Sequence, residues 1–185
     1  MTNLYLLRHG ETEENVRHIL QGHMPGTLTE RGRQQAVEAA RALADIPFDA
    51  ILSSDLKRCV DTAELFLSTL NAQQISPLWG IKGELFTLTP LLRERDWGSA
   101  TGMLVDKEHR IQIPPDVESV AAIKQRARIF LGFVAKTYPD QTVLAISHGL
   151  FCRFLQAVHY QKEISDIQPM HNTEFRLLTL QNRSN

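Results

Sequence analysis

Two apolar runs that lie far apart in the sequence each end in a His-Gly pair. Short apolar runs of this kind are typical of buried strands. The residues that follow the two runs are Arg8-His9-Gly10 and Ser147-His148-Gly149. Ligands of α/β sheets bind at the carboxyl ends of the strands. We therefore expect a sheet that brings both His-Gly pairs to one edge and builds a single site from them.

Strand candidates alternate with helical patterns along the chain. Strands are expected at residues 3–8, 48–53, 75–79, 142–147 and 174–180. Apolar residues at helical spacing predict helices over about residues 29–47, 55–70, 118–138 and 150–158. Thr29 and Asp55 are the expected N-caps of the first two helices. This alternation implies an α/β fold, a three-layer α/β/α sandwich with a mostly parallel central sheet.

Residues 80–117 break the alternation. They are rich in Pro and Gly, and we expect irregular structure there, over the functional edge of the sheet. The chain shows no internal repeat, low-complexity segment or linker. Its 185 residues suit one domain with a substantial core, so residues 1–185 are predicted to form a single domain.

Charge and composition exclude several classes of partner. The net charge of −1 gives no indication of a nucleic-acid partner or an anionic membrane surface. No apolar stretch is long enough to span a bilayer, and no secretion signal is recognised. Cys59 and Cys152 make no disulfide framework, so free thiols in the cytoplasm are expected. The oligomeric state is left open, with a homodimer as one alternative.

The segment after the second strand candidate adds positive charge to the same edge. A helix that follows a parallel strand directly points its N-terminus at the edge where His9 lies, and a helix N-terminus attracts anions. Arg58, one turn into this helix, is placed to reach that edge as a second guanidinium beside Arg8. Farther on, Glu94 supplies a carboxylate close to Trp97.

A series of short motifs follows in order along nearly the whole chain. They are Leu7-Arg8-His9-Gly10-Glu11-Thr12 with Asn15, Gln21-Gly22, Leu28-Thr29-Glu30-Arg31-Gly32, Gln35-Ala36, Ser53-Ser54-Asp55-Leu56-Lys57-Arg58 with Thr62, Leu92-Arg93-Glu94 with Gly98 and Gly102, Glu118-Ser119, Ser147-His148-Gly149 and Asn172-Thr173. Any one of them is a weak signal. Together they resemble the signature of the histidine phosphatase superfamily, also called the phosphoglycerate mutase-like family, and the resemblance implies that family's fold.

The resemblance implies that His9 is a nucleophile. One ring nitrogen would attack phosphorus and form a phosphohistidine, which splits one difficult displacement into two easier ones. For this the ring must be neutral, with its other nitrogen held by a hydrogen bond to a group such as a backbone carbonyl.

The resemblance also implies a clamp for the phosphoryl group. Arg8 and Arg58 would bind the phosphoryl oxygens, and a protonated His148 would add a third cation. Further contacts to the phosphate are expected from Asn15, Gln21, Gly22 and the backbone N–H of Gly149. Because these groups supply the positive charge, neither a metal nor a cofactor is expected.

Glu94 is the expected general acid and base. It would protonate the leaving oxygen and then deprotonate the water that hydrolyses the intermediate. Three other carboxylates lie nearby in the sequence and remain alternatives for this role: Glu84, Asp96 and Glu108.

The resulting functional prediction is a phosphomonoester phosphatase, a metal-independent hydrolase of the histidine acid type acting on a small phosphorylated metabolite. The alternative is a phosphoglycerate mutase, in which a second substrate hydroxyl, and not water, takes the phosphoryl group. The short chain and the thin expected cover over the pocket admit water and favour the phosphatase. The sequence does not name the substrate.

Two further readings belong to other functional classes. A non-catalytic module that binds a phospholigand has no need of the nucleophile, which this chain retains. A serine hydrolase is the other reading, because residues 145–149 partly match the G-x-S-x-G pattern. Its triad would consist of Ser147, Asp166 and His171.

Overall fold

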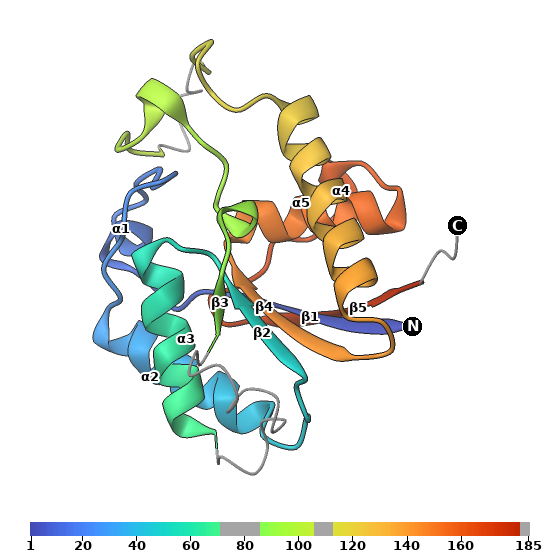
Figure 1. Ribbon diagram of the computed structural model, residues 1–185. Coiled ribbons are helices and arrows are strands. Elements are labelled where there is room, and N and C mark those ends of the chain that lie inside the picture. Colours follow the sequence, from blue (N-terminus) through green and yellow to red (C-terminus); the bar gives the residue numbers. More distant parts are fainter. Residues whose placement is uncertain (71–85, 106–112, 182–185) are drawn as a thin grey trace.

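A computed structural model describes residues 1–70, 86–105 and 113–181 of the chain. A five-stranded sheet with the strand order β3-β2-β4-β1-β5 forms its centre (Figure 1). The strands are β1 (Thr2–Arg8), β2 (Ala50–Ser53), β3 (Thr87–Leu88), β4 (Thr142–Ser147) and β5 (Phe175–Leu180). Neighbouring strands from β3 to β1 are parallel, and β5 pairs with β1 in the antiparallel direction. The predicted mostly parallel sheet is confirmed.

Four of the expected strands correspond to β1, β2, β4 and β5. The strand expected at residues 75–79 lies outside the described residues. β3 was not expected, since its two residues fall in the stretch 80–117 and both are exposed, which leaves no apolar pattern to detect. Other short elements of that stretch are the 3-10 helices η3 (Pro90–Leu92) and η4 (Gly98–Ala100).

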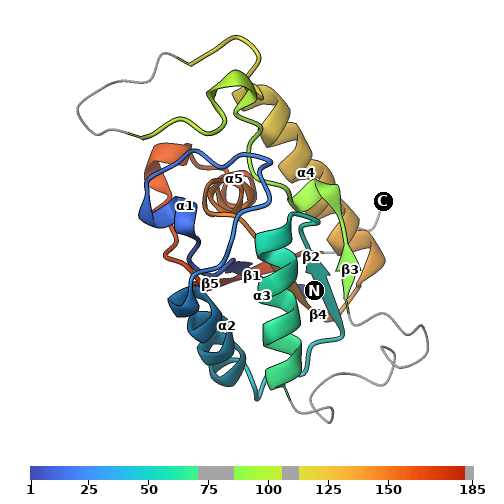
Figure 2. The ribbon, with the colours of Figure 1, turned by 90° about the vertical axis from the view of Figure 1, so that its left-hand side faces the viewer.

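Helices cover both faces of the sheet. α2 (Glu30–Ala42) and α3 (Lys57–Thr69) lie on one face, and α4 (Val120–Thr137) and α5 (Gly149–Tyr160) lie on the other (Figures 1 and 2). The core under α4 and α5 includes Leu4, Leu6, Val143, Phe130, Phe151 and Leu155. The core under α2 and α3 includes Leu7, Ile51, Leu144, Phe48 and Phe66. Alternate strand residues thus point to opposite faces, and the three-layer α/β/α sandwich is confirmed.

The boundaries of α2 and α3 agree with the prediction at one point and differ from it at two. Thr29 caps α2 as expected, its side chain accepting a hydrogen bond from the Gly32 N–H. The helix ends at Ala42, short of the expected end near residue 47, because residues 43–45 form a turn. Asp55 does not cap α3. Its carboxylate pairs with the Arg93 guanidinium at 2.7 and 2.6 Å, and the N-cap is Leu56, which makes no side-chain capping bond.

The parallel strands end at one edge of the sheet. Arg8 at the end of β1 is paired with Ser147 at the end of β4. His9, Ser54 and His148, each the first residue after its strand, therefore lie at the same edge, as the sequence predicted. Part of the cover over this edge comes from two segments that pair with each other through an isolated bridge between Ile19 and Leu104. No helix in the described ranges is long and apolar enough to cross a membrane.

Candidate active site

His9 lies directly after β1 and is only 3% exposed. Its ring Nδ1 is 2.7 Å from the carbonyl oxygen of Gly10, so Nδ1 donates its proton and Nε2 keeps a lone pair. Burial, and then the charges of Arg58 and Arg8, lower the pKa of His9 well below its usual 6.5. The ring is therefore neutral, and the predicted hydrogen bond to a backbone carbonyl is confirmed.

The Gly10 peptide that orients this ring is itself held in place. Its N–H donates to Oγ1 of Thr62 on α3 (3.1 Å), and the Thr62 hydroxyl donates to the carbonyl oxygen of Arg58 (2.7 Å). A Cβ at position 10 would collide with the carbonyl oxygen of Gly32 in α2, so the close approach requires a glycine. The junction of β1 with α2 and α3 thus sets the orientation of His9.

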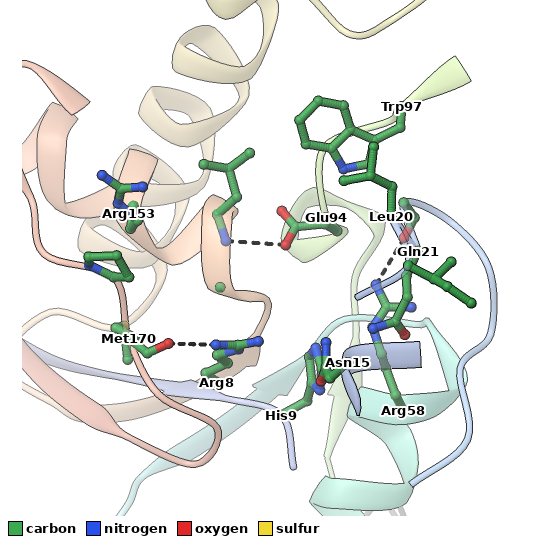
Figure 3. A pocket seen from close by; sticks show the side chains of 15 residues that line it. Arg8, His9, Asn15, Leu20, Gln21, Arg58, Glu94, Trp97, Arg153 and Met170 are labelled. Atoms are coloured by element: carbon green, nitrogen blue, oxygen red, sulfur yellow. Dashed lines mark hydrogen bonds between the residues drawn. The ribbon is translucent and has the colours of Figure 1, made fainter. Parts of the chain in front are cut away.

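Arg8 forms part of the pocket floor (Figure 3). Its Nη1 donates to the carbonyl oxygen of Met170 (2.6 Å), and its buried Nε has no hydrogen-bond partner in the described part of the chain. A Cβ at Gly149 would lie 3.1 Å from this Nε, so the glycine of the second His-Gly pair makes room for the guanidinium. Within the described ranges, Nη1 is the donor atom of Arg8 that is bonded to the protein, which leaves most of its N–H groups for an anion in the pocket.

Arg58 is almost fully buried and joins three parts of the site. Its Nε donates to Nδ1 of His148 (3.1 Å), its Nη1 to the carbonyl oxygen of Met24 (2.5 Å) and its Nη2 to that of Gly22 (2.9 Å). Burial lowers the pKa of Arg58, and likewise that of Arg8, from the usual range of a guanidinium. Arg58 therefore anchors the loop that carries Gly22 while it lines the pocket.

His148 is fully buried behind the pocket wall, with its ring centroid 5.3 Å from that of His9. Because its Nδ1 accepts from Arg58, Nε2 carries the proton and donates to Oγ of Ser54 (2.9 Å). Burial, followed by the charge of Arg58, lowers the pKa of His148 well below 6.5. In this structure the ring is neutral and bonded on both sides to the protein, which differs from the expected third cation.

Glu94 places its carboxylate at the N-terminus of α5, inside the same pocket. Oε1 accepts from the N–H groups of Arg95 (2.9 Å) and Phe151 (3.0 Å), and Oε2 accepts from the N–H of Leu150 (3.2 Å). These amides hold the carboxylate in the pocket that His9 also lines (Figure 3). The structure thus places Glu94, the expected general acid and base, in the same pocket as His9.

The alternative carboxylates are placed differently. Asp96 lines a separate cavity, together with His23 and Arg93. Glu84 and Glu108 lie outside the described residues. Among the described alternatives, the geometry therefore favours Glu94 for proton transfer in the pocket that contains His9.

The expected phosphate contacts Asn15, Gln21 and Gly22 all line the pocket. Oδ1 of Asn15 accepts from the backbone N–H of Thr12 and from Nδ2 of Asn172, both at 3.2 Å. The Nδ2 donors of Asn15 have no partner among the described residues, so they are free for an anion. Gln21 donates its Nε2 to Oγ1 of Thr12 (2.9 Å), and its buried Oε1 has no partner in the same part of the chain.

The pocket has a volume of about 280 Å³. Its described lining is Arg8, His9, Asn15, Ile19, Leu20, Gln21, Gly22, Arg58, Glu94, Trp97, Gly149, Leu150, Arg153, Pro169 and Met170. Arg153 was not predicted as a pocket residue, although its position one helical turn after Gly149 was a usable signal. Pro169 and Met170 were not predicted either, because they come from the segment before β5 and carry no such signal.

The serine-hydrolase reading is not supported by the geometry. The hydroxyl of Ser147 donates to the carbonyl oxygen of Leu92 (2.7 Å) and so helps to fix η3 against β4. Asp166 and His171, the other members of the considered triad, are exposed.

The two cysteines are buried free thiols. Burial raises the pKa of Cys59, and it raises the pKa of Cys152 to about 12. Both thiols are therefore protonated core groups rather than nucleophiles. Within the described ranges, no group of three or more His, Cys, Asp and Glu side chains is arranged to hold a metal ion.

Comparison with known proteins places this geometry in a family. The chain is 31% identical over 152 residues to an uncharacterized phosphatase of Bacillus subtilis, PhoE, covering 80% of this chain and 72% of that one. It is 30% identical over 172 residues to a 2,3-bisphosphoglycerate-dependent phosphoglycerate mutase of Bartonella henselae, covering 82% and 78%. A mycobacterial glucosyl-3-phosphoglycerate phosphatase, solved in complex with VO3, superposes with a TM-score of 0.78 at 26% identity, covering 96% and 92%.

The match extends to the family as a whole. The sequence profile of the histidine phosphatase superfamily (branch 1) matches residues 4–185, a range that contains every pocket residue described above. The chain belongs to the histidine phosphatase superfamily.

Proposed function

We propose that this protein is a metal-independent phosphomonoesterase that forms a phosphohistidine on Nε2 of His9. The observation that carries the proposal is a neutral His9, oriented by the Gly10 carbonyl, in a pocket with two guanidinium groups and one carboxylate. The phosphatases and the mutase to which the chain is similar support phosphoryl transfer as the chemistry.

The first half-reaction transfers the phosphoryl group to the protein. The Nε2 lone pair of His9 forms a bond to phosphorus, and the bond between phosphorus and the ester oxygen breaks. Glu94 gives a proton to the departing alkoxide. Arg8 and the Nδ2 group of Asn15 direct free donors at the equatorial oxygens, where charge is spread in the transition state. His148 contributes by holding Nε of Arg58 in place.

The second half-reaction returns the enzyme to its starting state. Water attacks phosphorus while Glu94 accepts its proton, the N–P bond breaks, and inorganic phosphate leaves. Nε2 of His9 regains its lone pair.

A phosphoglycerate mutase is the second candidate, because it shares the first half-reaction and one relative carries that name. The two activities differ in whether water or a substrate hydroxyl accepts the phosphoryl group. We favour the phosphatase, because phosphatase is the activity named both for the Bacillus subtilis relative and for the superposed mycobacterial structure. An assay of 3-phosphoglycerate that follows both phosphate release and isomer formation separates them.

Further parts of the proposal concern setting and partners. We propose a cytoplasmic protein, supported by two buried free thiols, which suit a reducing compartment. The proposed partner is a small phosphorylated substrate, and the nearly neutral net charge argues against nucleic acid and anionic membranes. A homodimer remains one proposed assembly, to be tested by sedimentation.

The proposal is tested by trapping the intermediate. Wild-type protein is mixed with an aryl phosphate that is labelled on its phosphoryl group, and the reaction is quenched in base. The protein should then carry the label in a form that is stable to base and released by acid. His9→Ala should carry no label and lose hydrolysis, while His171→Ala, which changes an exposed histidine outside the pocket, should keep both. Label on a serine, or full activity of His9→Ala, would overturn the proposal.

A further inference from the structure

Arg126 on α4 uses all of its N–H donors within the protein. Its Nη1 donates to the carbonyl oxygens of Leu91 (3.0 Å) and Arg93 (2.7 Å), and its Nη2 donates to that of Glu94 (3.4 Å). The remaining bonds go to Glu118, from Nε to Oε1 (3.0 Å) and from Nη2 to Oε2 (2.7 Å). A guanidinium has five N–H groups, so none is left for a ligand. Arg126 also lies outside the described lining of the active-site pocket.

Three of these bonds converge on the segment that carries Glu94. This segment follows η3 and forms neither a helix nor a strand at Glu94 itself. The carbonyl oxygen of Glu94 accepts a second hydrogen bond, from Nε2 of His23 (3.0 Å). Side chains therefore hold the backbone of Glu94 where regular secondary structure does not.

The same guanidinium contacts a residue that binds the Glu94 carboxylate. Cζ of Arg126 lies 4.1 Å from the centre of the Phe151 ring, and the N–H of Phe151 donates to Oε1 of Glu94. The orientation of Arg126 is fixed in turn by its ion pair with Glu118, in which the two side chains are only 17% and 13% exposed. Arg126 thus packs against both ends of Glu94, its backbone and the amide that binds its carboxylate.

Building on the proposed function, we infer that Arg126 is a positioning residue that aligns the Glu94 carboxyl group with the departing oxygen. An acid must lie within hydrogen-bond reach of the atom that it protonates, and a displacement of about 1 Å can cost about a hundredfold in rate. The described bonds of Arg8 and Arg58 go to other parts of the protein. Loss of Arg126 should therefore weaken acid catalysis and leave the phosphoryl clamp in place.

The test compares leaving groups in the phosphorylation step. Single-turnover kinetics at saturating substrate are measured with an alkyl phosphate and with an activated aryl phosphate. Arg126→Gln should slow the alkyl ester about tenfold or more and the aryl ester less, because an activated phenolate departs without a proton. The affinity for inorganic phosphate should remain that of wild type. If Arg126→Gln slows both esters by the same factor, its role is structural and the inference is overturned.

A double variant shows whether Arg126 acts through Glu94. Adding Arg126→Gln to Glu94→Gln should leave the ratio of alkyl to aryl rates at the value for Glu94→Gln alone, because two changes that act through one group do not add. A further fall in this ratio would show that Arg126 acts apart from Glu94, contrary to the inference.

Two more variants on α4 complete the comparison. Arg128→Gln makes the same chemical change at an exposed residue of this helix and should leave both rates unchanged. Arg126→Lys keeps the charge with fewer donors, so its ratio of alkyl to aryl rates should lie between those of wild type and Arg126→Gln. If Arg126→Gln does not fold, Arg126→Lys decides the question in the same way: a lowered ratio supports positioning, and equal slowing of both esters overturns it.

Nuclear magnetic resonance tests the inference apart from catalysis. The N–H of Leu150 donates to Oε2 of Glu94, and Glu94→Gln shows where the resonance of this amide lies once the carboxylate is lost. Arg126→Gln should move the resonance toward that position, and Arg128→Gln should not.

The two readouts separate the failure of the inference from that of the proposed function. If no ester is hydrolysed, or if Glu94→Gln slows both esters equally, the proposed role of Glu94 fails, and the Leu150 resonance still decides whether Arg126 positions the carboxylate. If Glu94→Gln slows the alkyl ester selectivity as expected but Arg126→Gln changes neither the rate ratio nor the resonance, the inference fails and the proposed function stands.

Discussion

Arg58 divides its hydrogen bonds between the protein and the pocket. A guanidinium has five N–H donors, and three of those of Arg58 go to His148, Met24 and Gly22. The other two have no protein partner among the described residues. The residue thus holds the pocket wall and presents charge at once, which a lysine with a single ammonium group would not reproduce.

The role of Glu94 is tested by the leaving group. An alkoxide needs a proton to depart and an activated phenolate does not, so Glu94→Gln should slow turnover of an alkyl phosphate about a hundredfold or more. The loss for an activated aryl phosphate should be smaller. Single-turnover measurement of the phosphorylation step isolates this effect from the later role of Glu94 as a base.

Asp96→Asn is the matched control for Glu94, because it makes the same chemical change beside a different cavity. We expect it to leave the ratio of alkyl to aryl turnover as in wild type. Equal losses for both substrates in Glu94→Gln would show that this residue positions substrate or supports structure, and that it is not the acid.

Buried His9 and His148 should make stability depend on pH. Burial lowers the pKa of each below 6.5, and unfolding returns it to about 6.5. Below that pH the unfolded chain binds more protons, so the free energy of unfolding falls as pH falls, by up to about 1.4 kcal/mol per pH unit for each histidine. Above about pH 6.5, the stabilisation that comes from keeping these two histidines neutral is fully present. Denaturant unfolding at a series of pH values measures the slope.

Two histidine variants check the origin of that slope. His148→Gln should flatten it between about pH 6.5 and the onset of carboxylate titration. His171→Gln, an exposed site, should leave it unchanged. An unaltered slope in His148→Gln would contradict the assignment.

At the scale of elements, α3 is tied to the end of β1 through Thr62. Thr62→Val keeps the shape but removes the acceptor for the Gly10 N–H, which should cost about 1–3 kcal/mol in the free energy of unfolding. It should also lower the rate of phosphohistidine formation, because the same peptide orients His9. Denaturant unfolding and single-turnover kinetics measure the two effects.

Thr69→Val on the same helix is the control for Thr62. The Thr69 hydroxyl donates to the carbonyl oxygen of Leu65 within α3, away from the pocket residues. We expect Thr69→Val to change the free energy of unfolding by no more than about 0.5 kcal/mol. Its rate of phosphohistidine formation should equal that of wild type. If Thr62→Val and Thr69→Val change the free energy of unfolding and the rate of phosphohistidine formation by similar amounts, the hydrogen bond between Gly10 and Thr62 has no specific role in orienting His9.

At the scale of the whole molecule, charge compensation comes from the protein itself. Arg8 and Arg58 reach the pocket from β1 and α3, so hydrolysis should survive EDTA. A metal-dependent phosphatase assayed in parallel serves as the control for chelation. Loss of activity in EDTA that a divalent cation restores would contradict this prediction.

Much of the fold was readable because its signals are local. Apolar runs gave β1, β2, β4 and β5, and helical spacing gave the helices on both faces of the sheet. β3 was not detected, since two exposed residues form no pattern and their pairing with β2 depends on the rest of the sheet. The cap of α3 was mispredicted because the partner of Asp55 is Arg93, which lies far along the chain.

For β1, β2 and β4, the sequence by itself determined where the strand ends and which residue follows it, since these depend on local periodicity. That was enough to place His9 and His148 at one edge. Only the tertiary structure decided which polar groups remain unpaired there. His148 is bonded on both sides and buried, while Nη1 of Arg153 has no hydrogen-bond partner in the part of the chain that the structure describes. The reason is physical: pairing depends on distances between residues far apart in the chain, and packing of the whole molecule sets those distances.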